Sequence, residues 1–164
     1  MMQIILIGMP GCGKTTVGRL LANRCGYAFL DLDTEIERDA KRKISEIFAK
    51  EGENTFRAME TAVLKKALLK EKTVISTGGG IIVREENRKL MQEKGTVVFL
   101  DRPLEKILSD VDIQERPLLA EGKEKVKLLY NQRYDNYCKT AAIRILNDLD
   151  AETAVVQICQ ALGL

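Results

Sequence analysis

Short runs of β-branched and other apolar residues alternate with longer stretches of helical periodicity, and this alternation limits the possible folds more than any other feature. The apolar runs cover residues 3–7, 27–30, 73–76, 96–100 and 142–146. Their almost continuous hydrophobicity is typical of strands buried on both faces of a parallel sheet. The intervening stretches predict helices at residues 14–24, 34–42, 55–70, 85–93, 103–110, 123–139 and 151–162. The pattern therefore predicts an α/β fold with a doubly wound sheet, whose ligands bind beyond the carboxyl ends of the strands.

Two of the predicted segments have a distinct character. The helix at residues 55–70 places one apolar stripe toward the core, formed by Phe56, Met59, Val63, Ala67 and Leu68. Residues 110–122 form the most polar and least periodic connection, so they are the best candidate for a mobile flap.

Length and composition narrow the class of protein. A chain of 164 residues suits one domain, residues 1–164, with a single core. The 26 basic and 24 acidic residues are spread along the chain, so the basic footprint of a nucleic-acid binder is missing. The sequence has no long apolar run and no signal peptide at its start, which predicts a cytoplasmic protein with no membrane partner. The four cysteines lack metal-type spacing and are expected to be reduced thiols, and the absence of histidine leaves a carboxylate or lysine as any catalytic base.

A glycine-rich loop joins the first predicted strand to the first predicted helix. Its sequence, Gly8-Met-Pro-Gly-Cys-Gly-Lys14-Thr15, fits G-x-x-x-x-G-K-[ST] in the context that phosphate binding requires. Backbone N–H groups and the helix N-terminus would face the phosphates of ATP, Lys14 would reach the β- and γ-phosphates, and the Thr15 hydroxyl would hold Mg²⁺. The residues expected around the nucleotide are Gly11, Cys12, Gly13, Lys14, Thr15 and Thr16. A simple helix-capping turn is the disfavoured alternative.

Cys12 lies inside this loop. It is interpreted as a small residue that fills space. The alternative is a regulatory oxidation site, because a helix N-terminus lowers the pKa of a thiol.

Two aspartates, Asp31 and Asp33, follow the second predicted strand. Because side chains alternate across a strand, both carboxylates are expected on the same side, above the phosphate loop. Asp33 could instead cap the next helix, but Thr34 and Glu37 are predicted to form a capping box there. The functional interpretation is favoured: one carboxylate helps order the Mg²⁺ hydration shell, and Asp33 orients an acceptor hydroxyl and serves as general base.

Two arginines on predicted helices have both an ordinary and a functional explanation. Arg57 could form a helix-surface ion pair with Glu60, and Arg133 could pair with Asp135 or Glu121. Together, two guanidinium groups with forked donors would instead form a specific clamp for one carboxylate. These residues alone leave the choice open.

Two further features each have an ordinary and a functional explanation, and neither feature alone decides between them. Gly78, Gly79 and Gly80 end the third predicted strand, which indicates either close approach to a ligand or a flexible loop. Arg116 in the expected flap is either a plain exposed arginine or a cation that swings onto the transferring phosphoryl group.

Taken together, these residues resemble the shikimate kinase family over nearly the whole chain. The family pattern stands here, in order, as the loop at residues 8–15, Asp31 with Asp33, Glu51-Gly-Glu-Asn-Thr-Phe-Arg57, Gly78-Gly79-Gly80, Arg116-Pro-Leu-Leu119 and Arg133-Tyr-Asp-Asn-Tyr137. Only the phosphate loop is widely shared with other kinases.

The resemblance implies ATP-dependent phosphorylation of shikimate to shikimate 3-phosphate, on the route to chorismate and the aromatic amino acids. It implies a five-stranded parallel sheet, a substrate-binding subdomain near residues 32–60 and a lid near residues 109–122. Lys14 and Arg116 would stabilise the transferring phosphoryl group, and Thr15 and Asp31 would serve Mg²⁺. The residues implied around shikimate are Asp33, Arg57, Gly78, Gly79, Gly80 and Arg133.

The chain also departs from the family pattern. Ser109 and Asp110 stand where many members carry an arginine against adenine, and residues 147–150 lack another. The alternatives are a related kinase acting on gluconate or a nucleoside monophosphate, or a catalytically idle nucleotide-binding module. A monomer is expected.

Overall fold

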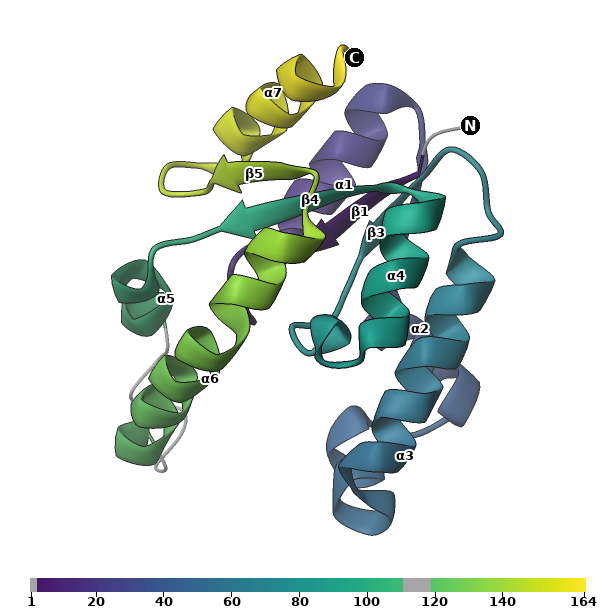
Figure 1. Cartoon of the computed structure of the whole chain (residues 1–164), viewed down its shortest axis with the longest axis vertical. Coiled ribbons are helices and arrows are strands. Elements are labelled where there is room, and N and C mark those ends of the chain that lie inside the picture. The colour runs from purple at the N-terminus through teal and green to yellow at the C-terminus, as the bar shows by residue number, and fades with distance from the viewer. Residues whose placement is uncertain (1–2, 111–118) are drawn as a thin grey trace.

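The computed structural model describes residues 3–110 and 119–164. In this part of the chain, five parallel strands form one sheet in the order β2-β3-β1-β4-β5 (Figure 1). Ile5 in the central strand pairs with Ile75 on one side and with Val97 on the other. The strands are β1 (Ile4–Ile7), β2 (Ala28–Asp31), β3 (Thr73–Ser76), β4 (Thr96–Asp101) and β5 (Ile143–Leu146). The predicted α/β class with a parallel sheet is therefore confirmed.

The apolar runs form strands because they are covered on both faces. Every residue of β1 and β3 is buried, and β4 is buried after its first residue. Each large aliphatic side chain buried in this way stabilises the fold by about 2 kcal/mol relative to its exposed state. The edge strands β2 and β5 are only partly buried, which explains their less uniform sequences.

Helices cover both faces of the sheet and complete three layers (Figure 1). On one face, α1 (Lys14–Cys25) packs against α7 (Ala151–Leu162). The other face is covered by α3 (Ile44–Ala67), α4 (Glu85–Lys94) and α6 (Leu119–Thr140). The remaining elements are α2 (Leu32–Ala40), η1 (Ile81–Val83) and α5 (Leu104–Asp110). No helix in these described residues has both the length and the apolar character needed to cross a membrane.

The largest difference from the predicted elements is at α3. It begins at Ile44 rather than at residue 55, because two helical segments join across Gly52, whose φ of 82° and ψ of 175° are not helical. The predicted apolar stripe is confirmed from Phe56 onward, with Val63 buried and Met59 half-buried. α2 also begins two residues earlier than predicted, which changes the position of Asp33.

The chain reverses its direction across the sheet at β1. From β1 it proceeds to β2 and β3 on one side, and later to β4 and β5 on the other. Ligands of open α/β sheets bind at such a reversal, beyond the carboxyl ends of the strands. The loop after β1 is the glycine-rich loop, so the fold places it at this position.

Candidate active site

The glycine-rich loop lies between β1 and α1, as predicted. Gly11 and Gly13 have φ values of 79° and 93°, in the left-handed region that favours glycine, and Gly13 caps α1. The ammonium of Lys14 is almost fully buried and donates to the carbonyl oxygens of Gly8 and Met9 at 2.8 and 2.9 Å. The loop therefore curves around the lysine at the positive end of the helix, which is the electrostatic requirement for binding a polyphosphate.

Asn147 follows β5 directly and holds this loop through a hydrogen bond. This residue was missed by the sequence analysis. Its buried side-chain amide donates to the carbonyl of Cys12 at 2.7 Å, and a Cβ added at Gly13 would come within 3.1 Å of the same nitrogen. Its position at the carboxyl end of β5 could have identified it, because β5 pairs with β4, the neighbour of β1. Cys12 itself is fully buried, which agrees with its interpretation as a space-filling residue.

Thr15 and Asp31 come together at the mouth of the loop. The Thr15 hydroxyl donates to Asp31 Oδ2 at 2.8 Å, and Asp31 Oδ1 accepts from the backbone N–H of Thr34 at 3.1 Å. Asp31 is thus the N-cap of α2, and the predicted capping box of Thr34 and Glu37 is wrong. Glu37 instead accepts from the backbone N–H of Ile44 at 3.1 Å, where it helps to hold the start of α3.

Asp33 lies in the first turn of α2 and not on β2, so the predicted alternation along a strand does not apply. Asp33 nevertheless faces the same cavity as Asp31, because α2 begins directly after Asp31. Burial raises the pKa of the Asp33 carboxyl above its ordinary value, and the nearby Asp31 carboxylate raises it further. The ammonium of Lys14 and the guanidinium of Arg57 oppose this rise. The carboxyl is therefore more basic than an exposed aspartate and interacts with two cations.

One cavity of about 460 Å³ joins these elements. Its lining comes from the glycine-rich loop, the aspartates after β2 and the glycine turn after β3. The lining residues are Pro10, Gly11, Gly13, Lys14, Thr15, Thr16, Asp31, Asp33, Thr77, Gly78 and Gly79. Most of the residues predicted around the nucleotide, together with Asp33, therefore share one space.

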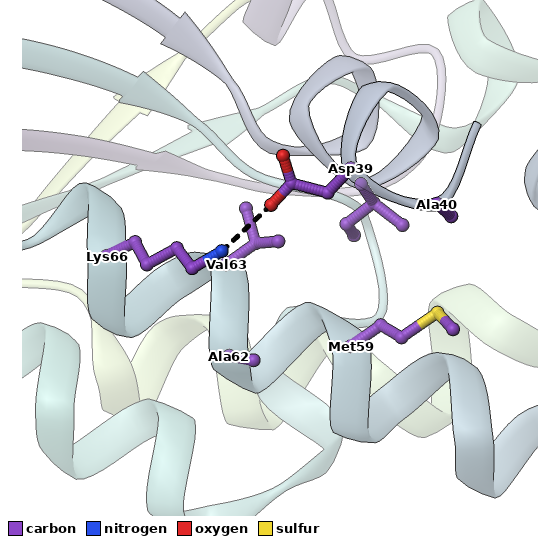
Figure 2. A pocket seen from close by; sticks show the side chains of 7 residues that line it. Asp39, Ala40, Met59, Ala62, Val63 and Lys66 are labelled. Carbon is purple, nitrogen blue, oxygen red and sulfur yellow. Dashed lines mark hydrogen bonds and ion pairs between the residues drawn. The ribbon is translucent and has the colours of Figure 1, made fainter.

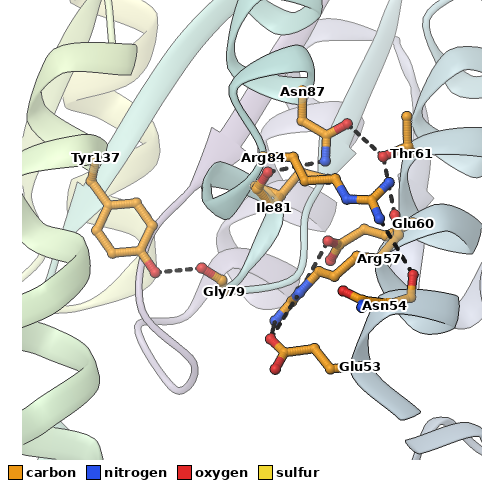
Figure 3. Close-up of polar contacts among 10 residues, drawn as sticks. All are labelled: Glu53, Asn54, Arg57, Glu60, Thr61, Gly79, Ile81, Arg84, Asn87 and Tyr137. Atoms are coloured by element: carbon orange, nitrogen blue, oxygen red, sulfur yellow. Dashed lines mark hydrogen bonds and ion pairs between the residues drawn. The ribbon is translucent and has the colours of Figure 1, made fainter.

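Arg57 lies beside this cavity on α3 and forms the predicted pair with Glu60, but the pair is buried rather than on the helix surface. Arg57 Nη1 donates to Glu60 Oε1 at 2.9 Å, and only 1% of the Glu60 side chain is exposed (Figure 3). Glu53 accepts from Arg57 at 3.4 Å. Burial raises the pKa of Glu60, and the Arg57 guanidinium opposes that rise. The second carboxylate oxygen of Glu60, Oε2, has no hydrogen-bond partner in the described part of the chain.

The glycine turn approaches these charged side chains closely. A Cβ at Gly78 would lie 2.8 Å from Asp33 Oδ1, and a Cβ at Gly80 would lie 2.3 Å from both terminal nitrogens of Arg57. A Cβ at Gly79 would lie 2.5 Å from the ring of Pro10 in the phosphate loop. Glycine is therefore required here by close packing against the site, which decides against the flexible-loop interpretation.

Arg133 is on α6, on the opposite side of the turn from α3. Burial raises the pKa of Tyr137 and that of Glu60, and the positive charge of Arg133 opposes both rises, so Arg133 contributes to the same electrostatic environment as Arg57. The predicted alternative partner Asp135 pairs instead with Lys139 at 2.6 Å. Arg116, and with it the greater part of the predicted lid, lies outside the described residues.

A second, smaller cavity of about 200 Å³ lies between α2 and α3 (Figure 2). Its wall is mostly apolar, with Ile36, Met59 and Val63 among the lining residues. The Asp39–Lys66 ion pair at 3.0 Å lies on its exposed side. It has neither phosphate-binding backbone nor clustered carboxylates, so the chemistry of the chain is concentrated in the first cavity.

The arrangement of the first cavity can hold a polyphosphate beside a second, hydroxyl-bearing anion. The loop and Lys14 supply the donors for the first, and the cations around Asp33 supply charge for the second. The oxygen donors of Thr15 and Asp31 also suit a hard divalent cation such as Mg²⁺, which prefers hydroxyl, carboxylate and phosphate oxygens.

Comparison with known proteins agrees with this geometry. The family model for shikimate kinase matches residues 10–163. The shikimate kinase of Clostridium beijerinckii is 42% identical over 156 residues, which cover 95% of this chain and 92% of that protein. The solved structure of shikimate kinase from Acinetobacter baumannii in complex with shikimate has a TM-score of 0.90 at 38% identity, covering 99% of this chain and 94% of that one. A gluconokinase from Sinorhizobium meliloti, with a TM-score of 0.59 at 17% identity over 99% of this chain and 95% of its own, shares the fold alone. The chain therefore belongs to the shikimate kinase family.

Proposed function

We propose that this chain is a shikimate kinase, which transfers the γ-phosphoryl group of ATP to the 3-hydroxyl of shikimate and yields shikimate 3-phosphate and ADP. The reaction belongs to the biosynthesis of chorismate and the aromatic amino acids. The observation that carries the proposal is the single cavity in which the phosphate loop faces Asp33 and the glycine turn. Membership of the family supplies the identity of the acceptor.

On the donor side, the proposed nucleotide contacts are the loop residues Gly11 to Thr16. Lys14 would neutralise charge on the β- and γ-phosphates, because its ammonium is already held at the centre of the loop. Asn147 keeps the loop in this shape through its bond to the Cys12 carbonyl. Arg116 is proposed to add a second cation on the transferring group.

On the acceptor side, Arg57 and Arg133 are proposed to bind the carboxylate of shikimate. Support comes from the close approach of Arg57 to Gly80, and from the electrostatic effect of both arginines on Glu60. Forked guanidinium donors match a carboxylate better than a single ammonium would. Gly78 to Gly80 would let the backbone lie against the ring.

Asp33 is proposed to orient the acceptor hydroxyl and to accept its proton. A bond forms between the hydroxyl oxygen and the γ-phosphorus, and the bond from that phosphorus to the oxygen bridging to the β-phosphate breaks. The proton of the hydroxyl passes to the Asp33 carboxylate, and the electron pair of the broken bond stays on ADP. The raised pKa of Asp33 supports this role, because a more basic carboxylate holds the proton better.

Thr15 and Asp31 are proposed to hold Mg²⁺, directly or through its water molecules. The ion, when bound, would offset the negative charge of the phosphates. We further propose a substrate-binding subdomain at residues 32–60, a lid at residues 109–122, a monomeric state and a cytoplasmic location.

Release of ADP measured with several acceptors tests the function. Shikimate should support turnover that depends on both ATP and Mg²⁺, and gluconate and nucleoside monophosphates should not. Turnover with gluconate or a nucleotide, and none with shikimate, would overturn the proposal in favour of a related kinase. ATP binding without turnover on any acceptor would indicate an idle nucleotide-binding module.

A further inference from the structure

Tyr137 on α6 is a buried polar side chain that the proposed chemistry does not use. Its ring is fully buried and stacks on Phe99 of β4 with centroids 5.1 Å apart. Its hydroxyl donates to the carbonyl oxygen of Gly79 at 2.6 Å (Figure 3). The same hydroxyl lies 3.8 Å from the sulfur of Met9 in the phosphate loop.

The glycine turn to which Tyr137 binds is where the two halves of the site meet. Gly79 is held between the Tyr137 hydroxyl on one side and the ring of Pro10 on the other. Its neighbours Gly78 and Gly80 face Asp33 and Arg57, as their missing Cβ positions show. A small rotation of the turn would therefore move it against both proposed acceptor-binding side chains.

The hydrogen bond also fixes the direction of one backbone donor. In a planar trans peptide the carbonyl of one residue and the N–H of the next point in opposite directions. Because the Gly79 carbonyl points to Tyr137, the N–H of Gly80 points away from α6, and the guanidinium of Arg57 lies beside Gly80. Among residues 3–110 and 119–164, no backbone carbonyl accepts a hydrogen bond from this N–H.

We infer that Tyr137 is a positioning residue for the acceptor. Its hydroxyl fixes the peptide between Gly79 and Gly80, so that the turn stays packed against Arg57 and Asp33. The inference rests on the proposed function and identifies a residue that acts on shikimate through the backbone it holds. Its loss should affect acceptor binding and leave nucleotide binding unchanged.

The variant Tyr137→Phe tests this role, because phenylalanine keeps the ring and its contact with Phe99. Loss of a hydrogen bond to a buried carbonyl is expected to raise the KM of shikimate about tenfold. The KM of ATP and kcat should each stay within about twofold of wild type, since the phosphate loop keeps its own hydrogen bonds. Steady-state ADP release with each substrate varied in turn gives all three values.

Tyr134→Phe is the matched control. Tyr134 lies one turn earlier on α6, packs against the same Phe99 ring and donates to Asp101 at 2.7 Å, away from the glycine turn. Both variants should lose similar thermal stability, but only Tyr137→Phe should raise the KM of shikimate. An unchanged KM of shikimate in folded Tyr137→Phe, or a rise in both substrates' KM values, would overturn the role of Tyr137. Wild-type protein that phosphorylates no shikimate would overturn the proposed function itself, which is a separate outcome.

A spectroscopic measurement on protein with the wild-type fold covers the case in which Tyr137→Phe unfolds at the assay temperature. The chain has 4 tyrosines, so fluorotyrosine incorporation gives a simple fluorine spectrum. The Tyr137 resonance is assigned by elimination with phenylalanine variants of Tyr27, Tyr130 and Tyr134. It should move when shikimate is added and stay in place when ADP is added. A Tyr137 resonance that does not respond to shikimate would overturn the inference.

Discussion

Burial and neighbouring charges together set the proton affinity of the Asp33 carboxyl. Burial is the main cause of its raised pKa, the Asp31 carboxylate is the second, and Lys14 and Arg57 act in the opposite direction. Since a base must be ionised to accept a proton, kcat/KM for shikimate should fall as the pH is lowered through this raised pKa. The acid limb of a pH–rate profile is therefore expected to have its midpoint above the ordinary aspartate value of 3.8.

The stability of the fold should depend on pH in the opposite direction. The folded state holds the Asp33 proton more tightly than the unfolded chain, so Asp33 contributes less stability as the pH rises through the same range.

The variant Asp33→Asn keeps the shape of the side chain and removes its charge. We expect kcat to fall by a factor of about 100 to 10,000, the usual contribution of a positioned general base. Asp39→Asn on the same helix is the control, because Asp39 is exposed and pairs with Lys66 away from the first cavity. A near-normal kcat in Asp33→Asn would show that transfer needs no base here, as a dissociative transition state permits.

Asn147 offers a test of the donor half at the same scale. In Asn147→Ala the carbonyl of Cys12 loses its buried donor, which costs about 1–3 kcal/mol of loop stability. The KM of ATP should rise and the KM of shikimate should stay near wild type. Asn87→Ala is a control, because Asn87 is an equally buried amide that bonds to Thr61 and to the Ile81 carbonyl outside the phosphate loop. Equal effects of Asn147→Ala on both substrates would contradict the assigned position.

At the scale of elements, the central strands and most helices could be predicted because burial on both faces leaves a continuous apolar signal. α7 begins and ends where the pattern indicates, with Asp150 as its N-cap. The first half of α3 was missed because Gly52 interrupts the periodicity that identifies its second half. The start of α2 was misplaced because the capping choice between Asp31 and Thr34 depends on a tertiary bond, from Thr15 to Asp31.

The break at Gly52 sets the direction of the helix that carries Arg57. Its φ of 82° and ψ of 175° fall in a region that is essentially restricted to glycine, so Gly52→Ala should cost about 2–3 kcal/mol of stability. Gly26→Ala is matched in exposure, since an added Cβ meets nothing within 4 Å at either position. The left-handed conformation at Gly26 should cost alanine only about 1 kcal/mol. Urea unfolding of both variants measures the difference, and equal losses would show that α3 tolerates a different path at this point.

The whole molecule assembles the site from segments that no local pattern connects. The strand order places β1 between β3 and β4, so the phosphate loop and the glycine turn become neighbours although 70 residues separate Gly8 from Gly78. Strand order depends on long-range pairing, which is why the sequence alone indicated candidate site residues but not how they touch. The contacts of Gly79 with Pro10 and Tyr137 are of this kind.

The reactivity of the four thiols tests the same arrangement, because the cysteines are buried to different extents. Cys138 is exposed and Cys25 is half-buried, whereas Cys12 and Cys159 are buried. In native protein a thiol reagent should modify Cys138 first, without loss of activity. Modification of Cys12 requires the loop to open, so it should be slow, should coincide with loss of activity and should be slowed further by ADP. In the variant Cys138→Ser, mass spectrometry times the modification of Cys12 separately from that of the half-buried Cys25. Rapid modification of Cys12 that leaves turnover unchanged would show that the loop does not need its buried thiol, and would also end the idea of a regulatory oxidation site at this position.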